Sequence, residues 1–514
     1  MKKRALISVY DKEHLADFAK ELVEKYNYEI VSTGATYKLL KEKGIKAIEV
    51  KEVTGFEEML NGKVKTLHPM IHAGILADLN NSDEAEQVKQ ANITPIDMVV
   101  VNFYPFSEVA EKEIELNSLI KNIDIGGPCM LRAAAKNFER VTAVSTPCQY
   151  KKVLEELAAY NGATSLDFRK ELALDAFKLT SEFDAIVLNT LSEKFVGDED
   201  LAGQYFSVIT KKQNSLRYGE NPHQAAAVYS KRNLLDFDIL NGKELSYNNI
   251  LDMTAATNII SEFYDVCAVA IVKHNAPCGV ALGADINEAY MKAFDCDPIS
   301  AFGGIVAFSQ VVNESLAKHL SSVFLEVLIA PDYTPKALEM LQQKKNLRII
   351  KLNTPLVEYK KFLDKEVRIT PFGTLVQEAD VAELNKDTFN VASKAKPTAE
   401  MIEDMIFAWK VVKHSKSNAI VIAKDFKAIG ISQGQTSRID AVEIALNKAC
   451  DGSKDAVMAS DGFFPAIDNI QAAAQGRIAA IIQPGGSIKD KDVIEAADKY
   501  NIVMITTGVR HFKH

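Results

Sequence analysis

Along its first 190 residues the chain alternates between short apolar runs and segments whose apolar residues recur every three to four positions. Arg4–Val9 is apolar and β-branched, which predicts a strand. Lys12–Tyr26 has the spacing of an amphipathic helix, and Asp11 is in position to cap its N-terminus. The apolar residues that this helix is expected to bury are Leu15, Phe18, Ala19 and Leu22.

The alternation continues through the N-terminal part of the chain. Tyr28–Ser32 and Ala47–Val50 predict two more strands, separated by a helix over Thr36–Lys43 that Gly44 ends. Asp97–Asn102 is nearly all apolar, as expected of a central parallel strand that is buried on both faces. This rhythm predicts a doubly wound α/β domain.

The pattern loosens between Leu191 and Lys212 into polar sequence with two glycines, which indicates a domain boundary. We therefore expect one domain over 1–195, a linker over 196–212 and a second region over 213–514. The second region predicts strands at 267–274, 303–309, 419–425, 427–432 and 479–484. Its Lys-rich middle, roughly Glu339–Asp387, is irregular and is expected to join two subdomains. Residues 270–283 and 419–432 are faintly alike, a weak indication of a duplication.

Composition narrows the class of protein. With 514 residues, 47% hydrophobic and 25% charged, the chain is of ordinary globular composition. Its net charge of −9 provides no general attraction for nucleic acid or an anionic membrane, so an anionic ligand needs local positive sites. No apolar stretch is long enough for a membrane span or a signal peptide. Six cysteines without a CxxC pair are typical of reduced thiols, and we expect a cytoplasmic protein.

Several short segments of the first half carry candidate chemistry. Thr33–Thr36 lies between a strand and a helix, where small residues and helix amides can hold an anion, although a simple capped turn has the same pattern. Lys63 and Lys65 alternate along an extended segment, as in a cradle for an anionic ligand, although a solvated charged loop would look the same. His68 and His72 have no zinc-site glutamate between them, and Pro69 disfavours a helix there.

Two further groups follow strong structural signals. Asn102 and Tyr104 come at the carboxyl end of the apolar strand, where open α/β sheets place their ligands. Asp124 precedes a Gly-Gly pair that allows close backbone approach and leads into a helix carrying Lys136. A lysine near an aspartate can carry a proton in catalysis, and the alternative is a surface lysine on a helix.

The second half has its own polar segments. Arg217 and Tyr218 open a turn-rich stretch, and the arginine could bind phosphate through two hydrogen bonds. Lys273 and His274 end an apolar strand, a setting that suits acid–base chemistry, although most Lys-His pairs are merely exposed. The following Pro-Cys pair lacks the other zinc ligands of a deaminase signature.

Taken together and in this order, the motifs are specific. STGAT, GKVKTLHP, NFYPF, IDIGGP, RAAAKN, LRYGENPHQ, VKHNAPCG, GQTSR, DGFFP, PGGS and the terminal RHFKH closely resemble the bifunctional purine-biosynthesis family that joins AICAR formyltransferase to IMP cyclohydrolase. The resemblance covers essentially the whole chain. It implies transfer of a formyl group from 10-formyltetrahydrofolate to AICAR, followed by closure of the FAICAR ring to IMP with loss of water.

The resemblance also implies an architecture and partners. The expected fold is a methylglyoxal-synthase-like α/β domain followed by two cytidine-deaminase-like subdomains without zinc. The expected assembly is a homodimer with transferase sites at the subunit interface, and no nucleic acid or membrane takes part. No catalytic metal is implied, and a bound monovalent cation is left open.

Functional residues of the family carry over to matching positions. The catalytic positions are Lys65, Tyr104, Asp124, Lys136, Lys273 and His274. The IMP and FAICAR positions are Tyr10, Asp11, Lys12, Thr33, Gly34, Ala35, Thr36, Lys63, Val64, Thr66, Asn102 and Ile125. The AICAR positions are Arg217, Tyr218, Asn249, Gly303, Arg438, Arg510 and Phe512. The folate positions are Asn418, Ile439, Phe463, Asp468, Ser487, Ile488 and Glu326, the last of which is aspartate in some members.

Two other functions compete with this interpretation. A methylglyoxal-synthase-like lyase would account for the first domain but leave the rest of the chain unexplained. A nucleotide sensor without catalysis would keep the anion site yet could lose Lys136 and His274, and both are present.

Overall fold

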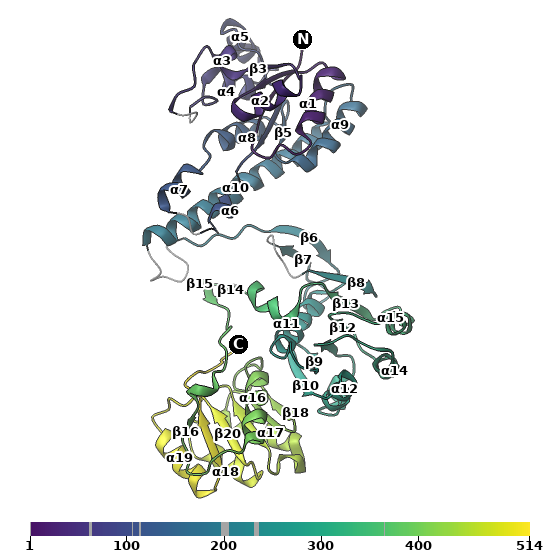
Figure 1. The fold of residues 1–514 in the computed structure, drawn as a ribbon, viewed down its shortest axis with the longest axis vertical. Helices are drawn as coiled ribbons and strands as arrows, with labels where there is room; N and C mark the ends of the chain where they lie inside the picture. The colour runs from purple at the N-terminus through teal and green to yellow at the C-terminus, as the bar shows by residue number, and fades with distance from the viewer. Residues whose placement is uncertain are drawn as a thin grey trace. The chain divides into compact units, whose positions relative to one another are not determined.

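The computed structural model describes residues 2–60, 64–104, 106–110, 112, 115–196, 205–230, 236–363 and 365–514. The chain forms two compact units, Met1–Ile209 and Thr210–His514, which we describe separately (Figure 1). Lys63, one of the expected nucleotide-binding residues, lies outside the described residues.

The first unit is built on a five-stranded parallel sheet of order β3-β2-β1-β4-β5. Its order reverses between β1 and β4, so their carboxyl ends flank a crevice of the kind in which open α/β sheets bind ligands. The strands are β1 (Arg4–Val9), β2 (Glu29–Ser32), β3 (Ala47–Glu49), β4 (Met98–Asn102) and β5 (Thr142–Val144). The helices are α1 (Leu15–Glu24), α2 (Gly34–Glu42), α3 (Val50–Thr54), α4 (Pro69–Leu76), α5 (Ser82–Gln90), α6 (Phe106–Ala110), α7 (Leu116–Lys121), α8 (Gly126–Lys136), α9 (Tyr150–Ala159) and α10 (Leu166–Val196).

Both faces of this sheet are buried. Along β4, Val99 packs into one hydrophobic cluster and its neighbour Val100 into the other. Successive side chains of a strand point to opposite faces, so helices must cover the sheet on both sides. This confirms the doubly wound α/β class. The four apolar positions expected on the first helix are all buried.

Two local expectations in this unit are wrong. Asp11 does not cap α1; His14 occupies that position, and the Asp11 carboxylate instead accepts the Glu13 N–H. Pro69 does not prevent a helix, because it stands at the first position of α4, where its missing N–H costs nothing. The last helix, α10, ends at Val196, where the expected linker begins.

The second unit is built on a twelve-stranded mixed sheet of order β16-β21-β20-β19-β17-β18-β10-β9-β11-β12-β13-β8. One set of its strands is β8 (Phe237–Asn241), β9 (Ala268–Lys273), β10 (Ala276–Leu282), β11 (Ile305–Phe308), β12 (Val327–Ala330) and β13 (Arg348–Leu352). The other set is β16 (Asn390–Val391), β17 (Ile420–Lys424), β18 (Lys427–Ser432), β19 (Val457–Ser460), β20 (Ala480–Gln483) and β21 (Val503–Thr506). The helices are α11 (Tyr247–Ser261), α12 (Ile286–Phe294), α13 (Pro298–Ala301), α14 (Glu314–Ser322), α15 (Pro335–Gln342), α16 (Ala399–Val412), α17 (Arg438–Ala449), α18 (Asp468–Gln475) and α19 (Asp490–Lys499).

The two sets of strands repeat one topology. From the centre outwards the first half runs β10-β9-β11-β12-β13-β8, and the second runs β18-β17-β19-β20-β21-β16. In each half a hairpin is followed by three parallel strands and closed by an antiparallel one. The halves meet where β10 and β18 pair antiparallel, Ala281 opposite Lys427. The faint likeness of residues 270–283 and 419–432 therefore falls on equivalent hairpins.

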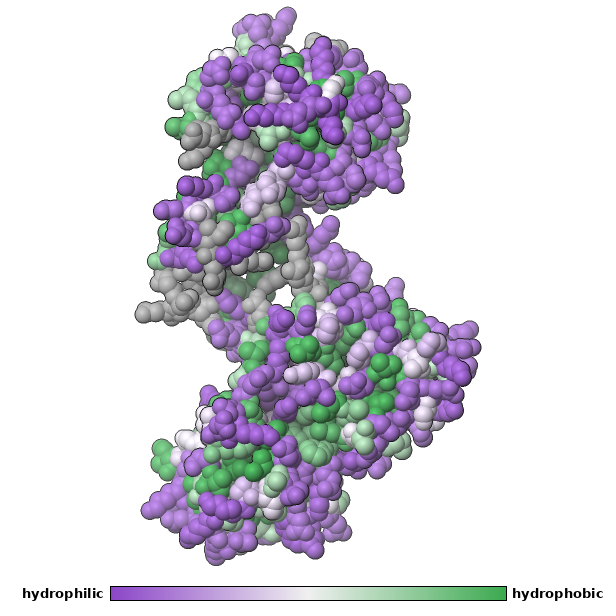
Figure 2. Space-filling view, in the orientation of Figure 1, coloured by the Kyte–Doolittle hydropathy of each residue, from purple (hydrophilic) through white to green (hydrophobic). Residues whose placement is uncertain are grey.

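The stretch expected to be irregular, Glu339–Asp387, contains regular structure. It includes the end of α15, the buried strand β13 and a separate hairpin of β14 (Lys365–Thr370) and β15 (Gly373–Glu378). The strand β13 is not evident from the sequence, because its short apolar run lies among frequent lysines. A second small hairpin, β6 (Lys211–Leu216) with β7 (Ala226–Ser230), begins the unit. On the face shown in Figure 2, polar side chains predominate, with apolar patches among them on the second unit.

Candidate active sites

The crevice of the first unit is tied together by Asn102 at the end of β4. Its Oδ1 accepts the backbone N–H groups of Tyr10 at 2.7 Å and Asp11 at 2.8 Å, and its Nδ2 donates to the Asp11 carbonyl at 3.1 Å. Tyr104 packs edge-on against Tyr10, with 4.4 Å between the ring centroids. The loops that follow β1 and β4 thus form one wall with two aromatic rings. Lys12 Nζ donates to the Tyr10 carbonyl at 2.8 Å.

The N-terminus of α2 lies at the same edge of the sheet. Thr36 Oγ1 accepts the Val9 N–H at 3.1 Å and donates to the Val9 carbonyl at 3.0 Å, which fixes the first turn of α2 against β1. A Cβ at Gly34 would lie only 3.1 Å from Nζ of Lys65. Free helix N–H groups and an ammonium group therefore converge around Thr33–Thr36, and this combination favours an anion.

Lys65 also connects α2 to the start of α8. Asp124 accepts the Gly127 N–H at 3.0 Å, and a Cβ at Gly126 would lie 2.9 Å from Oγ1 of Thr66. Burial raises the pKa of the Asp124 carboxyl above its ordinary value, while the Gly127 N–H, the Lys65 ammonium and the Gly126 N–H lower it. A half-buried acid that keeps contact with a cation is suited to proton transfer.

Lys136 is separated from this group. It is the last residue of α8, whereas Asp124 precedes the first, so the two lie about 15 Å apart along the helix axis. Its side chain is exposed. Within one chain the structure brings together the loop after β1, the start of α2, Lys65, Thr66, Asn102, Tyr104 and Asp124, but not Lys136. Val64 pairs with Met59 in an isolated bridge, and Ile125 is exposed just before α8.

In the second unit, Lys273 and His274 stand at the end of β9. His274 and Asn275 have φ angles of 54° and 61° and form a two-residue turn into β10. A histidine in this left-handed conformation costs about 1–3 kcal/mol, so it must be held by its surroundings. The Asn275 N–H donates to Oδ1 of Asp252 at 2.5 Å, and Lys273 Nζ donates to the Phe302 carbonyl at 2.8 Å.

We call this side of the twelve-stranded sheet the Lys273 edge. The starts of β11 and β12 bring Gly303 and Glu326 to it, because both strands run opposite to β9. Glu326 forms an ion pair of 2.8 Å with the buried Arg348. Asn249 is buried in the first turn of α11, where its Oδ1 accepts the Ser246 N–H at 3.1 Å.

Arg217 and Tyr218 belong to a neighbouring loop. Arg217 Nη2 donates to the Tyr218 hydroxyl at 2.6 Å, and the guanidinium carbon lies 4.6 Å from the Tyr218 ring centre. Asn248 Nδ2 donates to the Glu220 carbonyl at 3.2 Å, which ties the loop to the start of α11. Arg217 is exposed at this position, with its charge available to a ligand.

Arg438 is the centre of a buried polar cluster in the second half. Its guanidinium pairs with Asp461 and donates to Oδ1 of Asn418 at 2.7 Å and to Oγ of Ser460 at 3.1 Å. The Arg438 side chain is only 5% exposed, and its charge is neutralised by Asp461 of the same chain. Arg438 thus orients Asn418 and the start of the DGFFP segment.

The remaining residues of the second half lie around this cluster. The Arg510 guanidinium carbon is 4.6 Å from the ring centre of Phe512, and a Cβ at Gly462 would lie 2.5 Å from the same ring. Phe463 is partly exposed and Ile488 is fully exposed. Ile439 and Asp468 stand in the first turns of α17 and α18, and Ser487 Oγ accepts the Lys489 N–H at 3.1 Å.

The two groups of the second unit share one edge of the sheet. Because β10 and β18 pair antiparallel, the end of β9 lies on the same side as the ends of β19, β20 and β21. Gln433 Nε2 donates to the Pro277 carbonyl at 3.3 Å across the junction of the halves. All expected transferase residues of the sheet, from both halves, therefore lie along the Lys273 edge.

Several supporting residues carried no signal in the sequence. Asp252 sits inside a helix, 22 positions before the turn that it holds, and nothing in its local pattern marks it. Asp461 belongs to the DGFFP motif, but its pairing with Arg438 depends on the fold. Distant contacts of this kind become visible only when the strand order is known.

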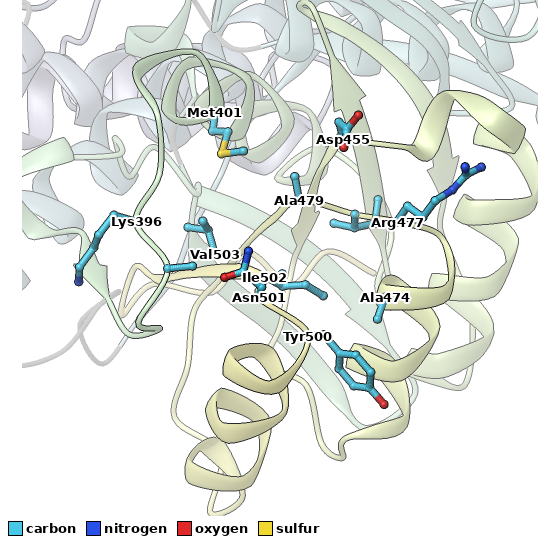
Figure 3. Close-up of a pocket in the computed structure, with 12 residues that line it drawn as sticks. Lys396, Met401, Asp455, Ala474, Arg477, Ala479, Tyr500, Asn501, Ile502 and Val503 are labelled. Carbon is cyan, nitrogen blue, oxygen red and sulfur yellow. The ribbon is translucent and has the colours of Figure 1, made fainter.

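The second unit also has two cavities, the smaller of which is lined in part by His511, the neighbour of Arg510 and Phe512. One of about 460 Å³ is lined by residues such as Lys396, Met401 and Arg477, at the edge of the sheet opposite Lys273 (Figure 3). One of about 180 Å³ lies beside the buried ion pair of Glu262 and Lys413. Neither is lined by an expected site residue. Among the described residues, no group of three or more His, Cys, Asp or Glu side chains is arranged to hold a metal, and no helix is long and apolar enough to cross a membrane.

Comparison with known proteins adds the family. Residues 134–448 match the model of the AICARFT/IMPCHase bienzyme family, and residues 14–129 match that of the MGS-like domain. The Bifunctional purine biosynthesis protein PurH of Caldicellulosiruptor saccharolyticus is 49% identical, and that of Persephonella marina is 47% identical, each over 100% of both chains. The crystal structure of ForH is 31% identical with a TM-score of 0.34, covering 37% of this chain and 100% of that one.

The chain has the architecture of an α/β enzyme with two units of different sheet topology, a five-stranded parallel sheet and a twelve-stranded mixed sheet, and each unit carries a group of charged and polar residues at the ends of its strands. The matches extend from end to end of the chain. The chain belongs to the AICARFT/IMPCHase bienzyme family. It is a bifunctional enzyme of purine biosynthesis, with AICAR formyltransferase and IMP cyclohydrolase activities.

Proposed function

We propose that the second unit transfers the formyl group of 10-formyltetrahydrofolate to the 5-amino group of AICAR, and that the first unit closes the ring of the resulting FAICAR. The observation that carries this division is the placement of two separate polar sites, one at the crevice of the parallel sheet and one along the Lys273 edge. Each has a cation beside a group that can exchange protons.

Ring closure requires attack of the carboxamide nitrogen on the formyl carbon and loss of the formyl oxygen as water. We place the nucleotide phosphate at the N-terminus of α2, with Thr33–Thr36 around it. Lys65, close to Gly34 and Asp124, stabilises charge on the formyl oxygen. Asp124 receives the proton of the amide nitrogen, and the raised pKa of its carboxyl favours that transfer. Tyr104 lines the same wall.

Lys136 is proposed as a proton carrier on the strength of the family resemblance alone. Its place at the end of α8 gives no support from within one chain. The Lys136→Ala variant tests this role.

Formyl transfer begins from an amine that is conjugated with the AICAR ring and is a poor nucleophile. We propose that His274 takes the proton of this amine while Lys273 stabilises the oxyanion of the tetrahedral intermediate. Collapse of the intermediate breaks the bond between the formyl carbon and the folate nitrogen, the protonated His274 returns its proton to that nitrogen, and tetrahydrofolate is released. Arg217 is exposed, and we assign it to the AICAR phosphate; we assign Asn418, which accepts a hydrogen bond from Arg438, to the folate.

We also propose a homodimer. The hairpin β14–β15 exposes large apolar side chains, with Ile369 86% and Phe372 101% accessible. A two-stranded hairpin is marginally stable alone in water, so a covered apolar surface would stabilise it. A second copy of the chain supplies such a cover, as the family resemblance implies. We further propose a cytoplasmic location, because six cysteines without a CxxC pair are typical of reduced thiols.

The division of labour is tested by two assays on the same protein. One follows tetrahydrofolate release from 10-formyltetrahydrofolate with AICAR, and the other follows IMP formation from supplied FAICAR. Substitutions in the first unit are expected to affect only the second assay, and substitutions at the Lys273 edge only the first. Loss of both activities from either single site would contradict the proposal.

A further inference from the structure

The His274 turn is held by a residue from another element. Asp252, on α11, accepts the Asn275 N–H at 2.5 Å and lies within electrostatic reach of His274 and Glu326. Burial raises the pKa of the Asp252 carboxyl, the Asn275 N–H and His274 lower it, and Glu326 raises it further. Glu326 is itself neutralised by Arg348. Asp252 is therefore in place to fix a turn whose first residue is a histidine with positive φ.

The second half of the unit repeats this arrangement. The turn between β17 and β18 contains Asp425 and Phe426, with φ angles of 53° and 56°. Their N–H groups donate to the Asp404 carboxylate at 3.0 and 2.8 Å. Asp252 and Asp404 are each the sixth residue of the helix that precedes the hairpin strand. The two carboxylates are therefore equivalent positions of the repeat.

Polar residues around the two turns differ. The backbone bonds Glu326 to Gly304 and Ala479 to Ala456 are equivalent, so Ala479 stands where the first half has Glu326. By the same register Val503 replaces Arg348. Figure 3 shows Ala479 and Val503 at the cavity of about 460 Å³, on the side of the sheet opposite the Lys273 edge. The anchoring carboxylate is thus common to both halves, whereas the Lys-His pair and the Glu-Arg pair occur only in the first.

We infer that Asp252 is a positioning residue for formyl transfer, acting through the Asn275 N–H to hold the His274 turn at the Lys273 edge. This inference rests on the proposed role of His274. Asp404, the equivalent residue of the second half, holds a turn that carries no histidine. Its substitution is therefore a control: it should disturb the sheet as the Asp252 substitution does, without displacing a catalytic residue.

The test compares full-length variants in both assays, with melting temperature measured for each. Asp252→Ala is expected to lower the transferase kcat about 10–100-fold, with the KM for AICAR nearly unchanged, because misplacing a catalytic group by about 1 Å costs up to about 10²-fold. Asp252→Asn is expected to recover most of this loss, since its amide oxygen still accepts the Asn275 N–H. Asp404→Ala is expected to keep the transferase kcat within about twofold of the wild type, and all variants keep cyclohydrolase activity.

Three results would overturn the inference: an unchanged transferase kcat in Asp252→Ala, an equal loss in Asp404→Ala, or no recovery in Asp252→Asn. If Asp252→Ala does not fold, Asp252→Glu takes its place, since one added methylene displaces the carboxylate. A loss of about tenfold in its transferase kcat supports the inference, and a loss below about twofold overturns it. His274→Ala is measured alongside. If that variant is active, the proposed function itself is wrong; if it is inactive while Asp252→Ala is active, only the present inference fails.

Discussion

Substitution of Lys65 by alanine is the most informative change in the first unit. Its ammonium is half-buried, lies beside Gly34 at the start of α2, and interacts with the Asp124 carboxyl. Among the described residues, Lys65 is the cation that lies close both to Gly34 and to Asp124. The variant removes a charge from a position where the fold already concentrates helix N–H groups.

The magnitude follows from that position. A unit charge about 4 Å from a developing oxyanion is worth about 4 kcal/mol at an effective dielectric constant of about 20. Loss of one such donor in other enzymes costs about 10²–10³-fold in kcat, or about 2.7–4 kcal/mol. We therefore expect Lys65→Ala to lower the cyclohydrolase kcat about 10²–10³-fold.

The pH dependence of cyclohydrolase activity in Lys65→Ala is a second, independent test. The Lys65 ammonium lowers the pKa of the Asp124 carboxyl, so its removal raises that pKa further above the ordinary value. If ionised Asp124 receives the proton, the acidic limb of the cyclohydrolase profile moves to higher pH in Lys65→Ala. The assay is IMP formation from FAICAR between pH 5 and 9, with transferase activity as the control. A kcat above about a tenth of the wild-type value, or an unmoved acidic limb, would refute the reasoning.

Three further substitutions test other parts of the account. His274→Ala should lower the transferase kcat about 10²–10⁴-fold and leave cyclisation intact; a well-folded variant above a tenth of normal activity would exclude a general-base role. Lys136→Ala should abolish cyclisation alone if Lys136 carries a proton, and normal IMP formation would show that the end of α8 takes no part. Phe372→Ser should shift a dimer towards monomer in sedimentation, and a monomeric wild type would contradict the proposed assembly.

Much of the fold follows from local pattern. Continuous apolar runs such as 97–102 are distinctive of central parallel strands, and helix spacing marks the buried face of α1. The sequence pattern does not predict β13, because its five residues include one arginine and one lysine and leave only three apolar positions. The hairpin β14–β15 was missed because its side chains are largely exposed and leave little hydrophobic alternation.

The sites were less accessible to sequence reasoning than the strands. Motif order predicts which segments carry the sites, and the register of the repeated halves explains why residues as distant as His274 and Arg438 share an edge. The partners that hold these residues, Asp252 and Asp461, come from elsewhere in the chain and depend on strand order. Lys136 stands at the end of α8, and its role in proton transfer stays a prediction that the Lys136→Ala variant tests.

The central claim is that the enzyme has two independent active sites and that the product of the transferase site, FAICAR, is the substrate of the cyclohydrolase site. The most direct measurement supplies AICAR and 10-formyltetrahydrofolate to Lys65→Ala, to His274→Ala and to an equal mixture of the two. We predict that Lys65→Ala releases tetrahydrofolate and accumulates FAICAR, that His274→Ala does neither, and that the mixture forms IMP. Failure of Lys65→Ala to accumulate FAICAR, or of the mixture to form IMP, would contradict the account.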